Sequence, residues 1–479
     1  MKPETPPLYE KVADEIAGMI ASGTFRPGER LPSLREVRAR RQVSMTTVQE
    51  SFRLLEDRGL IEARPQSGFF VRARQPAPPA VSCPCPEPQP VVTNALMWRY
   101  LRYVAASGGE TSFACATPAA ELYPARALNS LLAQVMRQQP GLLAEYGRSD
   151  GLPELCRQIA RRTLDWGHAL SAEDVLITNG CIEALNLCLQ AVTQPGDVVA
   201  IESPCYFGVL QLLENRGLKG LEIPTDPLTG ISLEALELAT RSGDVKAVIV
   251  VSNFSNPLGA LMPEDHKRRM VSMLDARGIP LIEDDVYGDF YFGRERPLPA
   301  KAFDRSGNVL YCTSFTKQAL PGLRVGWVAG GRYHAQLQMQ KFSVSFCTPP
   351  LMQAVTAEFL AAGGFDRHMR QLRRTLCRQV RETLEVVQDA FPEGTRLAEP
   401  QGGFLLWLEL PEGADSRALF DAALEEGIGF TPGQLFSPRD EFSRCLRLSC
   451  GFPLTPRREA ALRRLGELAR LQLEGQGQG

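Results

Sequence analysis

The first 75 residues carry apolar positions at the three- and four-residue spacing of amphipathic helices. The spacing predicts helices over 8–22, 34–41 and 45–59. Ser33 precedes the second helix and Glu36 follows three residues later, which is the arrangement of a capping box. A β-rich stretch at 60–71, interrupted by turn residues, predicts a hairpin. Three helices followed by a hairpin predict a winged helix-turn-helix.

From residue 110 onward, short β-branched runs alternate with helical stretches. The runs are nearly continuous in apolar residues, as expected of strands that are buried on both faces. The clearest of them are DVLITNG, DVVAIES, KAVIVVSN, IPLIEDD and NVLYCTSF. This alternation predicts an α/β main body with a mostly parallel sheet.

A proline-rich stretch at 75–92 separates the two patterns. Seven of its eighteen residues are proline, so neither a helix nor a central strand is expected there. We predict a winged helix-turn-helix domain over 1–74, an extended linker over 75–92 and a large domain over 93–479. Cys83 and Cys85 lie in the linker without the two further ligands that a metal site needs.

Composition and charge exclude several classes of protein. Hydrophobic residues make up 44% and charged residues 23% of the 479 residues, and the formal net charge is −2. The polar start carries no apolar signal-peptide core, and no apolar run reaches the ~18 residues that a membrane span needs. Twelve scattered cysteines favour reduced thiols over a disulfide scaffold. We therefore expect a cytoplasmic protein without a membrane segment.

A cluster of arginines in the first unit points to nucleic acid. Five arginines lie within twelve residues: Arg30, Arg35, Arg38, Arg40 and Arg41. A basic run is usually a solvated helix face, but this one covers the helix that would cross a DNA backbone. Small polar residues that suit phosphates and groove edges begin the next helix: Ser44, Thr46, Thr47 and Gln49. We favour DNA binding.

The elements PGERLPSLREV and VSMTTVQESFRLLEDRGLIEARPQSGFFV keep a recognisable order of Pro-Gly, Leu-Pro-Ser, Thr-Val and Ser-Gly pairs. In this order, residues 8–72 resemble the DNA-binding domain of the GntR family. The resemblance implies contacts with double-stranded DNA from five residues: Arg35, Thr46, Thr47, Gln49 and Gly68. Met45 stands where the family often has arginine, so a different base contact is expected there.

Polar side chains follow the predicted strands of the large unit, at the edge where α/β folds bind ligands. Pyridoxal phosphate needs a lysine for a Schiff base, an acid against its pyridine nitrogen, donors to its ring oxygen and an anion pocket. Lys317 fits the first role and Asp284 the second. Asn256 and Tyr287 can donate to the ring oxygen, and Tyr206 can stack on the ring.

The phosphate of this cofactor requires an anion site. We predict that it is held by the first amides of a helix together with two side chains: Gly180, Cys181, Ile182, Ser314 and Arg324. Alone, the paired acids after IPLIE would fit a solvated loop or a metal site. The order of the whole set along the strand ends favours pyridoxal phosphate, and no metal site is expected.

Seven stretches carry a second resemblance: EYGRSDGLPEL, TNGCIEAL, ESPCYFG, NPLG, EDDVYGDF, SFTKQALPGLRVGW and CLRLSCG. Through them residues 110–470 look like a fold-type I aminotransferase, with a small C-terminal α/β domain at roughly 365–470. The resemblance makes Lys317 the Schiff-base lysine. It implies that Tyr146 reaches the phosphate of a neighbouring subunit, and hence a homodimer, and that Arg447 binds a substrate or effector carboxylate. Cys181 and Ile182 replace common polar residues, so backbone amides would hold the phosphate.

A GntR-like segment joined to an aminotransferase-like segment resembles the MocR subfamily of bacterial transcriptional regulators. The resemblance implies a DNA-binding regulator that senses pyridoxal phosphate, or an amino acid or amine effector, through the Schiff base at Lys317. Two alternatives stay open. One is a working aminotransferase with an accessory N-terminal domain, and the other is a DNA-binding protein with a cofactor-free body. Residual half-transamination is compatible with a regulator.

Overall fold

The protein is represented by a computed structural model. It describes residues 7–476, apart from 22–23, 27, 65–66, 73–76, 85, 93–94, 107–110, 167–169, 320 and 440. The chain divides into two compact units, Met1–Pro76 and Ala77–Gly479, called the head and the body below.

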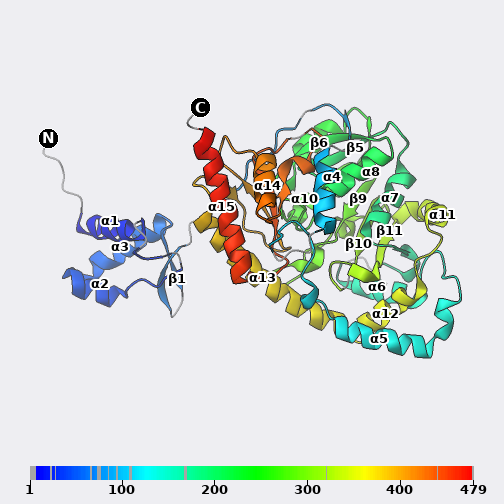
Figure 1. Cartoon of the computed structure of the whole chain (residues 1–479), viewed down its shortest axis with the longest axis horizontal. Coiled ribbons are helices and arrows are strands. Elements are labelled where there is room, and N and C mark those ends of the chain that lie inside the picture. The colour runs from blue at the N-terminus through cyan, green and yellow to red at the C-terminus, as the bar shows by residue number, and fades with distance from the viewer. Residues whose placement is uncertain are drawn as a thin grey trace. The chain divides into compact units, whose positions relative to one another are not determined.

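The described part of the head consists of three helices and a two-stranded antiparallel hairpin (Figure 1). These are α1 Leu8–Ala21, α2 Leu34–Arg41, α3 Met45–Asp57, β1 Ile61–Arg64 and β2 Gly68–Val71. Helix α2 begins with the predicted capping box, in which Ser33 N donates to the Glu36 carboxylate at 2.7 Å. Helices and hairpin share one core, where the rings of Phe52 and Phe69 lie 4.9 Å apart. The predicted winged helix-turn-helix is confirmed.

The body is built on a large sheet in the order β3-β6-β5-β8-β9-β10-β11-β4, with β7 paired to β6. Strands β6, β5, β8, β9 and β10 run parallel to one another, whereas β11 pairs antiparallel with β10 and β4. The bounds are β3 Gln89–Pro90, β4 Val175–Thr178, β5 Val198–Ser203, β6 Lys219–Asp226, β7 Gly230–Ile231, β8 Val245–Val250, β9 Leu281–Asp284, β10 Val309–Ser314 and β11 Gly326–Ala329. The mostly parallel sheet that the sequence predicts is confirmed.

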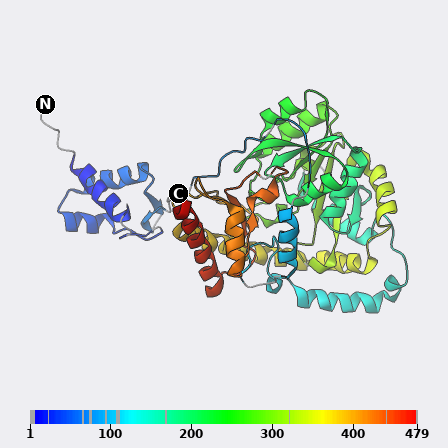
Figure 2. The ribbon, with the colours of Figure 1, turned by 45° about the horizontal axis from the view of Figure 1, so that its top comes forward.

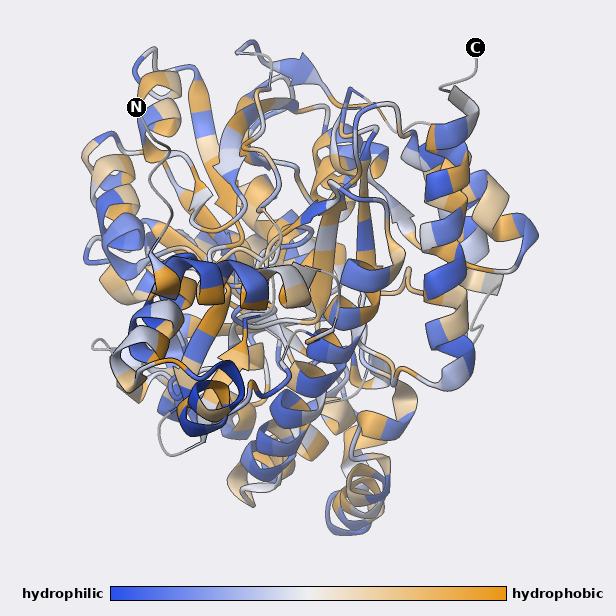
Figure 3. Cartoon of the chain, turned by 90° about the vertical axis from the view of Figure 1, so that its left-hand side faces the viewer, coloured by the Kyte–Doolittle hydropathy of each residue, from blue (hydrophilic) through white to orange (hydrophobic). Residues whose placement is uncertain are grey.

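Helices cover both faces of this sheet, because the strands are apolar on both faces (Figures 1 and 2). Ile201 and Ile249 pack with α7, α8 and α11, while their chain neighbours Ala200 and Val248 pack with α9 and α10. Figure 3 shows that the central strands are hydrophobic along most of their length. The remaining helices of this part are α4 Ala95–Ala106, α5 Ala125–Gln138, α6 Pro153–Arg162 and α12 Pro350–Ala361. The covering helices are α7 Cys181–Val192, α8 Phe207–Asn215, α9 Leu233–Ala239, α10 Glu264–Ala276 and α11 His334–Val344.

A second, antiparallel sheet follows in the order β12-β13-β15-β14. Its strands are β12 Arg396–Leu397, β13 Leu405–Glu409, β14 Thr431–Pro432 and β15 Cys445–Ser449. The helices around it are α13 Gly364–Ala390, α14 Ser416–Glu425 and α15 Pro456–Gln476. Helices α13 and α15 pack closely, since a Cβ at Gly466 would lie 2.4 Å from the carbonyl oxygen of Ala390. These elements form the small C-terminal α/β part that was expected from the resemblance.

The proline-rich stretch differs from the expected linker. From Ala77 onward its described residues belong to the body rather than to a spacer. Ala80 N donates to the Glu409 carboxylate at 2.8 Å, and the Ser82 hydroxyl donates to Ser203 O at 2.5 Å and accepts from Thr225 N at 3.1 Å. The segment ends in the short strand β3. Prolines lack an N–H but keep a carbonyl and an extended backbone, so the stretch can lie along the body without forming a helix.

None of the described helices is long and apolar enough to cross a membrane. The described residues also contain no group of three or more His, Cys, Asp or Glu side chains placed to hold a metal ion.

Candidate functional site

Lys317 follows the end of β10, in the turn between Ser314 and the 3-10 helix Pro321–Leu323. Its Nζ donates to the carbonyl oxygen of Ala116 at 2.7 Å and lies 5.2 Å from the ring centroid of Tyr287. Burial lowers the pKa of this amine. A buried lysine with a lowered pKa is more often neutral, which is the state that attacks a carbonyl carbon.

Asp284 is the last residue of β9, and its carboxylate is close enough to Lys317 to feel the charge of that amine. Its Oδ1 accepts hydrogen bonds from Val286 N at 3.2 Å and from Cys181 Sγ at 3.3 Å. Burial raises the pKa of Asp284 to about 6, and the charge of Lys317 opposes that rise. A cation placed against this carboxylate would keep it ionised, which is the role expected opposite a protonated pyridine nitrogen.

Arg447 is held on β15 by neutral partners. Its guanidinium donates to Asn256 Oδ1 at 3.1 Å and to Thr431 Oγ1 at 2.8 Å, and it also contacts Ala114 O. Its side chain is 1% exposed, and its Nε has no hydrogen-bond partner in the described part of the chain. A buried cation without an anion is costly, so this arrangement favours an anionic ligand.

At the start of α7, where the anion site was predicted, Gly180 and Arg324 lie against one another. Gly180 has φ +89°, and a Cβ there would lie 2.6 Å from Nη2 of Arg324, so glycine permits the close approach. Arg324 donates to Asn179 O at 3.0 Å. No side chain caps α7, which leaves its first amides available to an anion. Ser314 pairs with Gly326 of β11, which lies against the backbone of Gly180, and its Oγ accepts from Thr316 N at 3.0 Å.

Donors for a ring oxygen come from two further residues. Asn256 Nδ2 lies 3.5 Å from the hydroxyl of Tyr287, and Arg447 contacts the same asparagine. Burial raises the pKa of Tyr206 to about 12, while the nearby charge of Lys317 lowers it. The stacking role of Tyr206 stays a prediction. Together these side chains have the donors, acid, amine and anion site that fit pyridoxal phosphate.

In the head, the residues expected at DNA gather around the start of α3. Ser44 caps the helix, with its Oγ accepting from Thr47 N at 3.1 Å. Thr46 and Gln49 are exposed beside it, and so is Arg35 on α2. In the wing, a Cβ at Gly68 would lie 3.2 Å from Nε of Arg30, which brings that arginine against the hairpin. The exposed side chains suit contact with a phosphate backbone.

Two family patterns match the chain. "Bacterial regulatory proteins, gntR family" matches residues 8–71, and "Aminotransferase class I and II" matches residues 117–463. The uncharacterized HTH-type transcriptional regulators YdcR and YjiR of Escherichia coli strain K12 are 39% and 38% identical to it. Their alignments cover 97% and 96% of this chain and 99% and 98% of the relatives.

The chain belongs to the MocR subfamily of GntR regulators. It is a GntR-type DNA-binding transcriptional regulator fused to an aminotransferase-like domain. The body of this MocR regulator is also similar to LysN, the α-aminoadipate aminotransferase of Thermus thermophilus. That structure has a TM-score of 0.74 and 28% identity, and the match covers 80% of this chain and 96% of LysN. Aminotransferases of this class depend in general on pyridoxal phosphate.

The MocR body brings most of the predicted cofactor residues together, but two side chains lie elsewhere. Ile182 is 41% exposed, so only its backbone amide can serve the anion site. Tyr146 is 90% exposed and packs against Phe346, with ring centroids 5.4 Å apart. Tyr146 therefore does not enter the cavity of its own chain, and its role toward a neighbouring subunit stays a prediction.

The sequence did not predict the residues that position the cationic side chains of Arg447 and Lys317. Tyr100 on α4 and Thr431 on β14 contact Arg447, and Ala116 O accepts from Lys317. Tyr100 is 347 positions from Arg447 along the chain, and its helix shows only an ordinary amphipathic pattern. A local sequence pattern carries no signal for such a contact.

Proposed function

We propose that the body of this MocR regulator binds pyridoxal phosphate at Lys317, and that an amino compound in the same cavity changes the affinity of the head for operator DNA. Buried Arg447 carries this proposal. Its guanidinium has only neutral partners among the described residues, and its Nε has none. Because such a cation is costly to bury, its presence favours a ligand with a carboxylate.

Each cavity residue has a distinct task in this account. When bound, pyridoxal phosphate supplies an aldehyde that reacts reversibly with primary amines. Lys317 offers the amine of the protein, and the lowered pKa of that amine increases its neutral fraction. Asp284 would hold a proton at the pyridine nitrogen. Arg447 would orient an incoming amino acid by its carboxylate, through a planar fork of donors.

An amino acid in this cavity would join two parts of the body. Arg447 lies on β15 of the second sheet, whereas Asp284 ends strand β9 of the large sheet and Lys317 follows its strand β10. A ligand that contacts all three residues favours arrangements in which the two sheets are close. It can change the affinity for DNA only to the extent that it binds one arrangement more tightly than the other.

We further propose a homodimer. Aromatic side chains that a monomer would expose to water lie together: Tyr146 contacts Phe346, and Phe346 contacts Phe342 at 5.2 Å between ring centroids. Phe342 is 57% exposed, and Met339 is exposed one turn earlier on α11. An exposed apolar patch of this kind is typical of a subunit interface. Since the head must reach the chromosome, we also infer that the protein acts in the cytoplasm.

A working aminotransferase is the alternative. The cavity retains Lys317, Asp284 and Arg447, and the body is 32% identical over 345 residues to a 2-aminoadipate transaminase of Thermus thermophilus. The arginines and exposed polar residues of the head favour the regulator, because a metabolic enzyme has no use for them. Turnover of an amino acid to a keto acid at a catalytic rate would favour the enzyme.

Fluorescence anisotropy with DNA from upstream of the protein's own gene tests the proposal. The titration is run at several salt concentrations, with cofactor-loaded protein and a panel of amino acids. The proposal expects tight binding that weakens as salt increases and that shifts with one amino compound. Weak, sequence-indifferent binding with keto acid accumulating instead would assign the protein to the enzymes. Arg35→Gln should lower the salt slope by about one, as loss of one phosphate contact does.

A further inference from the structure

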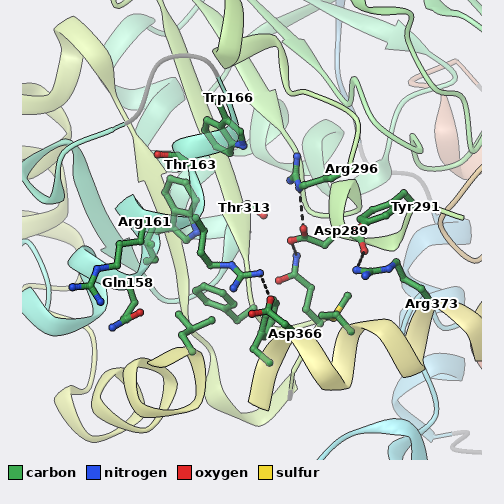
Figure 4. A pocket seen from close by; sticks show the side chains of 18 of the residues that line it. Gln158, Arg161, Thr163, Trp166, Asp289, Tyr291, Arg296, Thr313, Asp366 and Arg373 are labelled. Atoms are coloured by element: carbon green, nitrogen blue, oxygen red, sulfur yellow. Dashed lines mark hydrogen bonds and ion pairs between the residues drawn. The ribbon is translucent and has the colours of Figure 1, made fainter. Parts of the chain in front are cut away.

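A cavity of about 670 Å³ lies beside strand β10 of the large sheet. Figure 4 shows side chains that line it. Tyr311 and Thr313 of β10 line it. Cys312 between them points to the other face, where its Sγ lies 3.4 Å from Cys188 of α7. Side chains alternate between the faces of a strand, and Asp284, which pairs with Cys312 and accepts from Cys181 of α7, lies on that other face. The cavity is therefore separate from the predicted cofactor acid.

The wall of the cavity is strongly basic. Six arginines and two aspartates line it, a formal excess of four positive charges: Arg161, Arg162, Arg294, Arg296, Arg370 and Arg373 against Asp289 and Asp366. They come from the end of α6, from the segment around the 3-10 helix Gly288–Phe290 and from the first half of α13. Segments far apart in sequence thus converge on one concentration of positive charge.

Part of this charge is compensated and part is not. Arg296 pairs with Asp289 at 2.9 Å, and Arg162 pairs with Asp366 at 2.7 Å. Figure 4 shows Arg296 and Asp289 pointing toward one another. Arg161, Arg294 and Arg370 have no carboxylate partner within 4.0 Å among the described residues, and all three are exposed at the rim.

Arg373 adds a cation deeper in the wall. It donates to Asp289 O at 3.3 Å and stacks over the ring of Tyr291 at 4.1 Å. Burial lowers the pKa of this arginine, and the charges of Asp289 and Asp366 oppose that change. An anion in the cavity would supply the partner that the wall lacks.

We propose that this cavity binds a small polyanion that carries two or more phosphate or carboxylate groups. Guanidinium groups match both anions through paired N–H donors. The volume falls within the range of small-molecule pockets, and buried Trp327 and Phe315 at its inner wall leave a concave rather than a flat surface. This site goes beyond the proposed function, since it is separate from the cofactor cavity.

The arginine-lined cavity is connected to the predicted cofactor site by two short paths. Arg296 donates to the buried carboxylate of Asp285 at 2.6 Å, and Asp285 is the chain neighbour of Asp284. Gln318, the neighbour of Lys317, donates to Asp289 at 2.9 Å. An anion that draws Arg296 away from these aspartates therefore alters the partners of residues adjacent to the cofactor acid and lysine.

A nucleic acid backbone is the competing occupant, because the arginines continue along the outside of α13 through Arg374, Arg378 and Arg381. The cavity favours the small anion, since its inner wall lies between the sheet and the helices, where a duplex cannot enter. The two occupants call for different side chains. Arg161 and Arg162 line this cavity alone, whereas Arg374 and Arg378 line only a neighbouring hollow along α13. Three arginines line both: Arg294, Arg370 and Arg373.

Isothermal titration calorimetry of the full-length, cofactor-loaded protein tests the site, with inorganic pyrophosphate and citrate as the phosphate and carboxylate probes. The double variant Arg161→Gln/Arg162→Gln removes two charges that line this cavity and not the neighbouring hollow. The control Arg374→Gln/Arg378→Gln removes two charges that line only the neighbouring hollow along α13. We expect the cavity variant to bind at least one probe about tenfold or more weakly, and the control to match the wild type.

Absence of binding heat with both probes would overturn the proposed polyanion site in this cavity. An equal loss of probe affinity in both double variants would also overturn it. Loss of DNA affinity in the cavity variant without any binding of the probes would assign these arginines to nucleic acid instead. The comparison between variants holds whether or not Lys317 carries a cofactor. Its failure therefore leaves the proposed function untouched, and failure of the proposed function leaves this comparison valid.

Discussion

Arg447 on β15 donates a hydrogen bond of 3.1 Å to Asn256, which lies in the loop after β8. The guanidinium that would bind an effector carboxylate is therefore tied to a residue expected at the cofactor ring. A ligand that moves Arg447 would change the hydrogen bonding of Asn256, because one hydrogen bond joins the two side chains. The contact joins the residue proposed for the effector carboxylate to the residue proposed for the cofactor ring.

Arg447→Lys keeps the charge but removes the planar fork that matches a carboxylate. We expect the cofactor-loaded variant to bind its amino acid effector at least about tenfold more weakly, because charge-assisted hydrogen bonds are lost. Spectral titration of the bound cofactor measures this affinity. The corresponding amine without a carboxylate is the control, and its affinity should not change. An equal loss for both ligands would contradict the assignment of Arg447.

Gly180→Ala and Gly196→Ala form a matched pair. Both glycines have a positive φ, +89° and +92°, so each alanine should cost about 1–3 kcal/mol of stability. A Cβ at Gly180 would lie 2.6 Å from Arg324, whereas a Cβ at Gly196 meets nothing within 4 Å. Only Gly180→Ala should weaken binding of pyridoxal phosphate, as measured by titration. Equal cofactor affinity in the two variants would show that the contact with Arg324 has no part in phosphate binding.

Asp284→Asn should change the pH dependence of stability in the cofactor-free protein. Burial raises the pKa of Asp284 from its ordinary 3.8 to about 6, so the native state binds the proton more tightly than the unfolded chain. The stabilising contribution is complete below about pH 4 and is lost as the pH rises through about 6. Relative to Asp284→Asn, the wild type should lose about 3 kcal/mol across this window. Urea unfolding at pH 4 to 7 measures it, and parallel curves for the two proteins would contradict the assignment.

Phe342→Glu should dissociate the proposed dimer, because it places a charge in the aromatic patch formed with Phe346 and Tyr146. Leu238→Glu on α9 is the control, since Leu238 is also well exposed, at 67%, but lies outside the patch. Sedimentation velocity measures the mass of both variants and of the wild type. A monomeric wild type, or dissociation of both variants, would refute this interface.

The sequence predicted those structural features that depend on neighbouring residues along the chain. The capping box of Ser33 and Glu36, the start of α7 at Gly180 and the lysine after β10 follow from spacing and strand ends. Such features need only a few adjacent residues, so one sequence is enough to predict them.

The sequence did not predict features that are formed by segments far apart along the chain. Tyr100 reaches Arg447 from a helix whose pattern is ordinary, and the basic cavity joins α6 to α13 across some two hundred positions. The proline-rich stretch was predicted as a spacer because its composition excludes helices. Composition does not show that Ala80 and Ser82 find partners on the body.

The central claim is that the cavity at Lys317 controls binding of DNA by the head. Operator affinity of the wild type and of Lys317→Ala, each with cofactor and with or without the effector amino acid, tests it most directly. We predict that the amino acid changes the affinity of the wild type for operator DNA by about fivefold or more, which is typical of allosteric coupling. The operator affinity of Lys317→Ala should not change. An equal change in both proteins, or none in the wild type, would contradict it.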